Sequence, residues 1–243
     1  MYFKKTVKTR LGFEFITKCK MPSYGRGGKR SPKSEPTSEK KKKYNLRKAI
    51  EKLFYILLEN FNPGDYHMVL TYPVGTVQDI SEAKSKVSSF LTSYRKYCKS
   101  NGYKCEYVYN SEIGERGAIH HHIILHRYND YELIEDLWRK VSGGRVSYKS
   151  NLWANYDWYG LAKYFVDKTK DGKLPDTHIP CERHYVPSKG LKRPEITIER
   201  IDADRWYKPK APKGYELISD SVRGGVDDLT GGAFLKYTIR RRI

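Results

Sequence analysis

The chain has 243 residues, of which 38% are hydrophobic, and its 47 Lys and Arg outnumber its 28 Asp and Glu, which gives a formal net charge of +19. No apolar run approaches the roughly 18 residues that span a bilayer, and the first residues lack the apolar core of a signal peptide, so we expect neither a membrane protein nor an exported one. The charge favours a polyanionic partner, with nucleic acid as the first candidate.

Cysteine and tyrosine usage narrows the class further. The four cysteines form neither a CxxC pair nor a zinc-ligand spacing, so we interpret them as reduced thiols of a cytoplasmic protein. The 21 tyrosines, together with the basic residues, suit stacking on exposed bases and contact with phosphates, although most of them are expected to pack at the edges of the core. The cysteines are Cys19, Cys98, Cys105 and Cys181.

Hydrophobic periodicity predicts helices and strands in alternation along the chain. The order strand, helix, hairpin, helix, strand, helix indicates an α+β fold with a mainly antiparallel sheet. Asp79 and Glu82 have the spacing of a capping box at the start of the second helix. The predicted helices are 44–60, 80–98, 130–141 and 156–169. The predicted strands are extended segments in 2–20, then 66–72, 104–112, the histidine-rich stretch in 114–127, 145–148 and 195–201.

Composition divides the chain into four parts. Residues 1–22 form an N-terminal extended segment, and residues 23–43 form a flexible basic loop or arm, because Gly, Pro, Ser and Lys dominate there without apolar periodicity. The arm suits contact with phosphates, and a solvated linker is the alternative. Residues 44–200 form the main domain, and residues 201–243 form a basic C-terminal extension.

Three consecutive histidines in a predicted strand are the most informative feature. Because neighbouring side chains of a strand point to opposite faces, His120 and His122 share one face and His121 points to the other, with Ile119 and its apolar neighbours. Two imidazoles side by side on a strand can hold a divalent metal. His126 shares the face but lies about 13 Å from His122 by strand rise, so it is a weak ligand candidate.

The hairpin that leads into this strand supplies a carboxylate. Pairing Glu112 with Ala118 across a five-residue loop places Asn110 opposite His120 and leaves Glu112 diagonal to His120 on the same face. One carboxylate and the two imidazoles, His120 and His122, can then converge. That set suits Mg²⁺ or Mn²⁺ when substrate phosphate and water fill the open positions.

A nucleophile for such a metal site is found on the fourth predicted helix. Tyr164 and Lys168 are four residues apart and lie on one helix face, where the ammonium and a metal-bound phosphate would both favour the phenolate. Tyr159 and Lys163 form a second pair at the same spacing. The two tyrosines differ by about 140° around the helix, so we expect one catalytic tyrosine, Tyr164.

Three motifs in this order resemble the HUH endonuclease superfamily, specifically the rolling-circle replication initiators, or Rep proteins, of plasmids and single-stranded DNA phages. Val69 to Tyr72 resembles the first motif, His120 to His122 the His-hydrophobe-His motif, and Tyr164 to Lys168 the tyrosine motif. The matches span 66–168, with looser similarity over 44–200. Two departures are a histidine at the middle position of the second motif and a tyrosine-to-lysine spacing of four residues, where many members have three.

The resemblance implies a five-stranded antiparallel, RRM-like sheet flanked by helices, with 44–200 as the endonuclease domain. It implies that Tyr164 attacks single-stranded origin DNA to give a 5′-phosphotyrosyl enzyme and a free 3′-hydroxyl, and that reversal rejoins strands. It further implies Mg²⁺ or Mn²⁺ as the cofactor, a bacterial host cytoplasm, and host helicase and polymerase as partners, since no helicase phosphate-binding loop is present. The implied metal ligands are Glu112, His120 and His122, and the implied DNA contacts are Thr71, Tyr72, Arg116 and Lys163.

Two other interpretations stay open from the sequence. A relaxase or transposase of the same superfamily shares the chemistry, although relaxases usually have three histidines at the metal. A non-catalytic single-stranded nucleic-acid-binding protein would explain the charge and the aromatic residues, but not the set formed by Glu112, His120 and His122. A histidine-triad nucleotide hydrolase is disfavoured, because the next alternating position is Ile124 rather than histidine.

Overall fold

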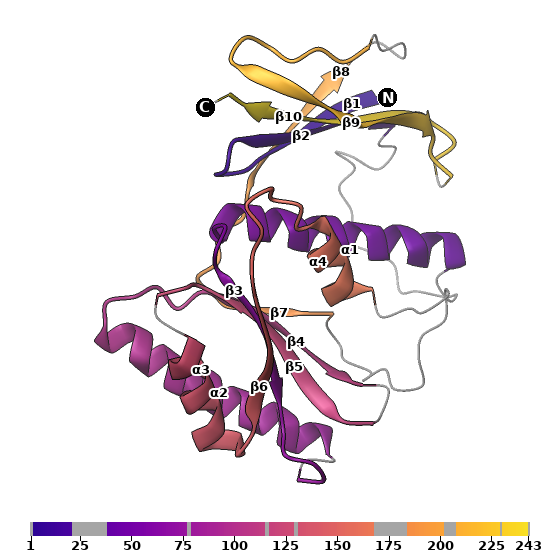
Figure 1. Cartoon of the computed structure of the whole chain (residues 1–243). Helices are drawn as coiled ribbons and strands as arrows, with labels where there is room; N and C mark the ends of the chain where they lie inside the picture. Colours follow the sequence, from indigo (N-terminus) through magenta and orange to yellow (C-terminus); the bar gives the residue numbers. More distant parts are fainter. Residues whose placement is uncertain are drawn as a thin grey trace. The chain divides into compact units, whose positions relative to one another are not determined.

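The chain consists of two compact units, which we describe separately. The computed structural model describes residues 2–20, 38–76, 79–114, 117–128, 131–167, 184–201, 208–228 and 230–242. We call Met1–Lys48 with Arg193–Ile243 the terminal unit and Ala49–Lys192 the central unit. Each unit is built on its own antiparallel five-stranded sheet (Figure 1).

The sheet of the central unit contains the predicted histidine strand at its middle position. Its strand order is β6-β3-β5-β4-β7, so β5 (Ile119–Leu125) lies between β3 (Tyr66–Thr71) and β4 (Tyr107–Ile113). All of its pairings are antiparallel. The edge strands are β6 (Arg145–Asn151) and the two-residue β7 (Val186–Pro187).

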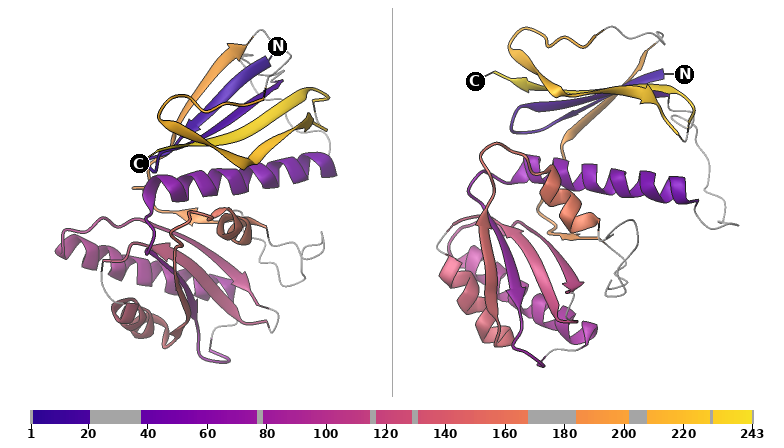
Figure 2. Two further views of the ribbon diagram at one scale, coloured as in Figure 1. Left: turned by 45° about the horizontal axis from the view of Figure 1, so that its top comes forward. Right: turned by 45° about the vertical axis from the view of Figure 1, so that its right-hand side comes forward.

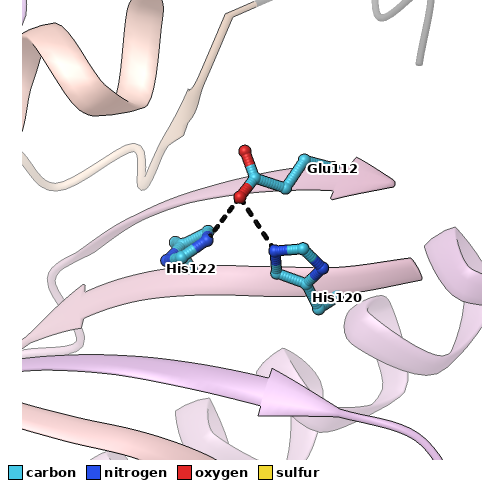
Figure 3. Close-up of side chains that lie close together, drawn as sticks. All are labelled: Glu112, His120 and His122. Atoms are coloured by element: carbon cyan, nitrogen blue, oxygen red, sulfur yellow. Dashed lines mark hydrogen bonds and ion pairs between the residues drawn. The ribbon is translucent and has the colours of Figure 1, made fainter. Parts of the chain in front are cut away.

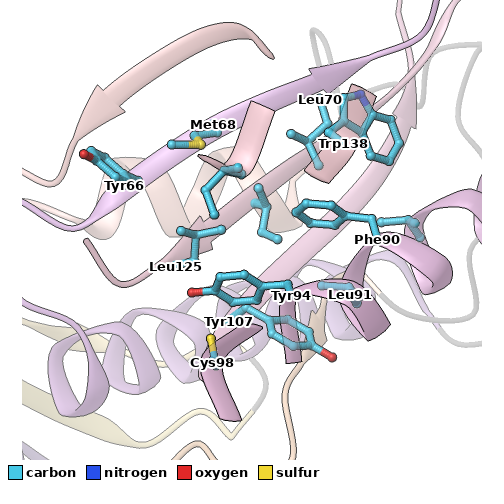
Figure 4. Close-up of a cluster of buried hydrophobic side chains, with 13 residues drawn as sticks. Tyr66, Met68, Leu70, Phe90, Leu91, Tyr94, Cys98, Tyr107, Leu125 and Trp138 are labelled. Carbon is cyan, nitrogen blue, oxygen red and sulfur yellow. The ribbon is translucent and has the colours of Figure 1, made fainter. Parts of the chain in front are cut away.

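One face of this sheet forms the hydrophobic core with α2 (Ile80–Ser100) and α3 (Tyr131–Ser142) (Figure 4). Fully buried side chains fill this layer, and burying each of the large ones contributes roughly 1.5–3 kcal/mol. They include Met68, Leu70, Phe90, Ile123, Leu125 and Trp138. The opposite face is the one that displays His120 and His122, and α4 (Tyr159–Val166) packs on it (Figure 1).

Three helices begin where local capping chemistry allows. Asp79 caps α2 as predicted, and its side chain accepts a hydrogen bond from the N–H of Ser81. The first helix, α1 (Glu39–Asn60), begins five residues earlier than predicted, because Ser38 Oγ accepts from the N–H of Lys41 and so continues the helix into the lysine run. The fourth begins later than predicted, because Tyr156 has a φ of +59°, which an α-helix does not accept.

The terminal unit contains a second sheet that the sequence did not predict. Its strand order is β8-β1-β2-β10-β9, so the first and last strands of the chain join in one sheet (Figure 2). Its strands are β1 (Tyr2–Lys8), β2 (Phe13–Lys20), β8 (Glu195–Ile201), β9 (Tyr215–Val226) and β10 (Ala233–Arg241). The last two strands escaped prediction because basic residues and glycines occupy both of their faces, which hides the alternation of a half-buried strand.

The fold class predicted from the sequence, α+β with an antiparallel five-stranded sheet flanked by helices, is confirmed. Most of the predicted basic arm, residues 23–37, lies outside the described residues, as does Cys181. The other three cysteines are free thiols. None of the described helices is long and apolar enough to cross a membrane.

Candidate metal and nucleophile site

Glu112, His120 and His122 meet on the helix-α4 face of the central sheet (Figure 3). Glu112 Oε1 lies 2.8 Å from Nε2 of His120 and 2.7 Å from Nε2 of His122. His122 is only 3% exposed, whereas Glu112 and His120 are half-buried. A single carboxylate oxygen therefore bridges two imidazoles at a site that stays open to solvent on one side.

The register that produces this geometry differs from the predicted one. Glu112 pairs directly with His120, not with Ala118, and Asn110 pairs with His122. The loop is 114–118 rather than 113–117, because Gly114 donates its N–H to the carbonyl of Ala118 at 2.8 Å and Gly117 takes a positive φ of 75°. The error left every side chain on its predicted face, since the residue numbers of the true partners also add to an even number.

The three donor atoms fit a divalent cation. All of them lie within 4.8 Å of one another, and two imidazole nitrogens with one carboxylate oxygen form a ligand set that accepts divalent ions. Three protein ligands would leave coordination positions for water and for substrate oxygen atoms. The group could therefore hold a metal ion beside a substrate.

A fourth histidine supports the site and was missed by the sequence analysis. His67 of β3 is 8% exposed, and its Nε2 lies 3.2 Å from Nδ1 of His122. Burial, together with the neighbouring His122, lowers the pKa of His67 to about 3, so its imidazole is neutral. Its position two residues before Val69 on an alternating strand indicates the same face as His122, and this parity was the available clue.

His121 belongs to the opposite face, as predicted. It is fully buried, with Nε2 2.6 Å from the hydroxyl of Tyr72 and Nδ1 2.7 Å from Oγ of Ser111. Burial lowers its pKa to about 3, so this histidine is a neutral core residue. The hydroxyl of Tyr72, a predicted DNA contact, is thus placed on the core face, where it also donates to the carbonyl of Ala83.

Tyr164 reaches the same group of side chains from α4. Its hydroxyl donates to Glu112 Oε1 at 3.2 Å and lies 3.1 Å from Nε2 of His122, while its ring remains 46% exposed. Burial of the hydroxyl and the nearby Glu112 carboxylate raise its pKa above the ordinary value of a phenol. Asn110 holds the helix in place, because its Nδ2 donates to the carbonyl of Phe165 at 3.1 Å.

The remaining predicted site residues are dispersed. The ring of Tyr159 packs edge-on against Phe54 of α1, with ring centroids 5.6 Å apart, and Lys163 is exposed on α4. Thr71 pairs with His120 in the sheet, and its hydroxyl donates to the carbonyl of Arg145. Two further predicted residues, Lys168 and Arg116, lie outside the described residues.

His126 has a separate role at the far end of the strand. Its Nδ1 lies 2.9 Å from Asp65 Oδ2, and its Nε2 lies 2.9 Å from Glu106 Oε2, all largely buried. Burial alone would lower the pKa of His126, but the two hydrogen bonds to carboxylates outweigh it, and the pKa is raised. This imidazolium bridges two acids and ties the ends of β3, β4 and β5 together.

Exposed aromatic side chains gather in one segment of the chain. Among the described residues the four exposed aromatic side chains all fall between Tyr148 of β6 and Tyr164 of α4. Trp153, in the loop between these elements, is the most exposed of the four at 64%. Its carbonyl accepts a hydrogen bond from the indole N–H of Trp158 at 3.0 Å, so the backbone that presents the ring is anchored.

The fold and site together define an α+β protein with a candidate metal group beside a tyrosine. Comparison with family models identifies the same region of the chain: residues 65–170 match the model of the replication-associated protein ORF2 family. The matched stretch contains Glu112, His120, His122 and Tyr164 and is consistent with a Rep-type replication protein. No curated protein and no solved structure gave a match.

Proposed function

We propose that this protein is a metal-dependent endonuclease that initiates rolling-circle replication by nicking single-stranded DNA at an origin. Tyr164 is the nucleophile, and Glu112, His120 and His122 hold Mg²⁺ or Mn²⁺. The products are a 5′-phosphotyrosyl enzyme and a free 3′-hydroxyl, and the reverse reaction rejoins strands. The similarity of 65–170 to replication-associated proteins supports a role in replication initiation.

The observation that carries this proposal is the position of the Tyr164 hydroxyl. It lies within 3.2 Å of Glu112 and of His122, so a nucleophilic oxygen of the helix is beside the candidate metal ligands. A tyrosine that merely packed on the sheet would not need its oxygen at the carboxylate. Reaction geometry of this kind, with nucleophile and electrophilic centre held on rigid elements, removes much of the entropic barrier.

A divalent ion at this site would polarise the phosphodiester and stabilise the charge that develops on its oxygens. Tyr164 attacks phosphorus through its phenolic oxygen, and the bond from phosphorus to the 3′ oxygen of the preceding nucleotide breaks. The phenol gives up its proton and the departing 3′ oxygen gains one, so the step is balanced in protons. In this structure the hydroxyl already donates to Glu112, which gives that proton a path out of the phenol.

Cations near α4 complete the proposed site. We propose that Lys168, with Lys163 as the secondary candidate, neutralises the scissile phosphate, and that Thr71 and Arg116 contact the DNA backbone. The exposed aromatic residues between Tyr148 and Tyr164 support a single-stranded substrate, because unpaired bases stack on exposed rings. Host helicase and polymerase would supply unwinding and synthesis in the cytoplasm of a bacterial cell.

The test is a search for the covalent intermediate. The protein is incubated with labelled single-stranded DNA from the region around its gene and Mn²⁺, and products are separated on a denaturing gel. We expect an adduct with the unchanged protein and with Tyr159→Phe, a matched control on the same helix, and none with Tyr164→Phe. An adduct that persists in Tyr164→Phe contradicts the assignment, and binding without any adduct favours a non-catalytic single-stranded nucleic-acid-binding protein.

A further inference from the structure

The two units divide the charge of the protein very unequally. The terminal unit holds 27 Lys and Arg against 11 Asp and Glu, whereas the central unit holds 20 against 17. The terminal unit therefore accounts for 16 of the 19 net positive charges. Residues 65–170, which match the replication-associated family, contain no part of the terminal unit. The basic charge thus belongs to a sheet that the proposed nicking site does not use.

Several of these charges gather at one end of the terminal sheet. The turn between β1 and β2, the end of β10 and the turn before β9 meet there (Figures 1 and 2). The carbonyl of Gly12 accepts from the N–H of Arg241 at 2.9 Å, and the carbonyl of Gly214 accepts from the N–H of Arg242 at 2.9 Å. The exposed basic side chains of this end, which we call the basic end, are Lys8, Arg10, Lys213, Arg241 and Arg242.

The backbone geometry keeps the basic end in place. Gly12 has a φ of +78°, and a Cβ added to it would lie 3.2 Å from the Cβ of Arg241, so the turn and the last strand approach closely only because this residue is glycine. Three carboxylates lie on the same strands. Glu14 accepts a hydrogen bond from the hydroxyl of Tyr215, Glu195 pairs with Lys8 and Glu216 pairs with Arg240. Cations still outnumber them at this end of the sheet.

The terminal unit differs from the central unit in a second way. Its exposed large apolar side chains are Ile196, Val222 and Val226, and none of its described aromatic residues is exposed. Single-stranded DNA is held by stacking on exposed rings together with phosphate contacts, whereas a duplex hides its bases and presents phosphates. A cationic surface without stacking rings therefore fits the duplex, while the exposed rings of the central unit fit the single strand.

We infer that the terminal unit is a duplex-DNA-binding module whose basic end contacts the phosphate backbone. This inference rests on the proposed function for its choice of DNA as the polyanion. The basic end spans β1 to β9, three strand spacings or about 14 Å. A duplex presents one negative charge per roughly 1.7 Å of its axis, so this edge faces about eight phosphate charges. Binding there would keep the nicking unit on double-stranded DNA that flanks the single-stranded target.

The experiment measures duplex affinity of the full chain as a function of salt. A fluorescein-labelled duplex of mixed sequence is titrated with the Arg10→Gln/Arg241→Gln/Arg242→Gln variant and with a charge-matched control on α2, Arg95→Gln/Lys96→Gln/Lys99→Gln. If each of the three residues contacts one phosphate, the salt slope falls by about 2.7, and affinity falls about 100-fold at about 0.15 M salt. The control should retain most of its affinity, and the triple Lys variant of the basic end should bind like the unchanged protein.

Three results would overturn the inference: no duplex binding by the unchanged protein, equal losses in the variant and the control, or an equal loss for the corresponding single strand. Thermal unfolding of the variants confirms that they are folded. Adduct formation with single-stranded DNA separates this inference from the proposed function. It should be unchanged in the basic-end variant, and its absence from the unchanged protein would refute nicking without affecting the duplex result.

Discussion

Replacing His67 with Leu tests whether a buried histidine orients the metal ligand beside it. For His122 to offer a lone pair at Nε2, its proton must sit on Nδ1, which lies 3.2 Å from Nε2 of His67. Because His67 is held neutral, its Nε2 can accept that proton in a hydrogen bond. Leu offers no acceptor. The Nδ1 proton of His122 is then unsatisfied, and the ring loses the contact that fixes its tautomer and orientation.

The magnitude follows from burial. Loss of a hydrogen bond that orients a metal ligand typically weakens metal binding about 10–100-fold, or about 1.4–2.8 kcal/mol. His122 is only 3% exposed, so water has little access to replace the lost acceptor, and we expect the upper part of that range. The free energy of unfolding without metal should fall by roughly 1–3 kcal/mol, the cost of one unsatisfied buried donor.

The assay is calorimetric titration with Mn²⁺, accompanied by denaturant unfolding. His67→Gln places an amide oxygen near the position of Nε2 and should recover most of the affinity. His121→Leu is the matched control, because it removes a buried hydrogen-bonded histidine from the core face of β5 and should lower stability without weakening Mn²⁺ binding. Equal Mn²⁺ affinity in His67→Leu and the unchanged protein would refute this reasoning.

Further predictions concern the same unit. Trp153→Ala should leave stability unchanged and weaken single-stranded DNA binding about 5–100-fold, for a stacking energy of about 1–3 kcal/mol, as measured by anisotropy; unchanged affinity contradicts it. Glu112→Gln should weaken Mn²⁺ binding and abolish the adduct while keeping salt-sensitive DNA binding, and an active variant would remove Glu112 from the site. His126 has a raised pKa, so its contribution to stability is complete below about pH 6.5 and lost as pH rises through that raised value. Denaturant titrations should show this loss in the unchanged protein and not in His126→Gln.

The central unit was accessible to sequence reasoning because its faces follow simple periodicities. Alternation along β5 assigned His120 and His122 to one face and His121 to the other, and parity across the hairpin brought Glu112 to the same face. The error in register came from the loop, whose position depends on the hydrogen bond between Gly114 and Ala118 rather than on any apolar pattern. The parity rule tolerates such an error of two, which is why the ligand set survived it.

The terminal unit was not accessible in this way. β1 and β2 meet β9 and β10 only through pairings between the two ends of the chain, for example Ile16 with Tyr237, and local sequence contains no information on such distant partners. The same limit applies to His67, whose importance depends on β3 lying beside β5. Tyr164 was predictable as a candidate, but its position over the sheet depends on the tertiary hydrogen bond from Asn110 to Phe165.

The run of three histidines also makes metal binding a check on how β5 is paired. A slip of one residue along β3 and β4 would turn His121 toward the metal face, flanked there by Ile119 and Ile123, so only one imidazole would be available. Only the native register presents two. A bound cation would therefore add its binding free energy to the native pairing and withhold it from the slipped ones. The ion that we assign to chemistry would then also select the correct strand alignment during folding.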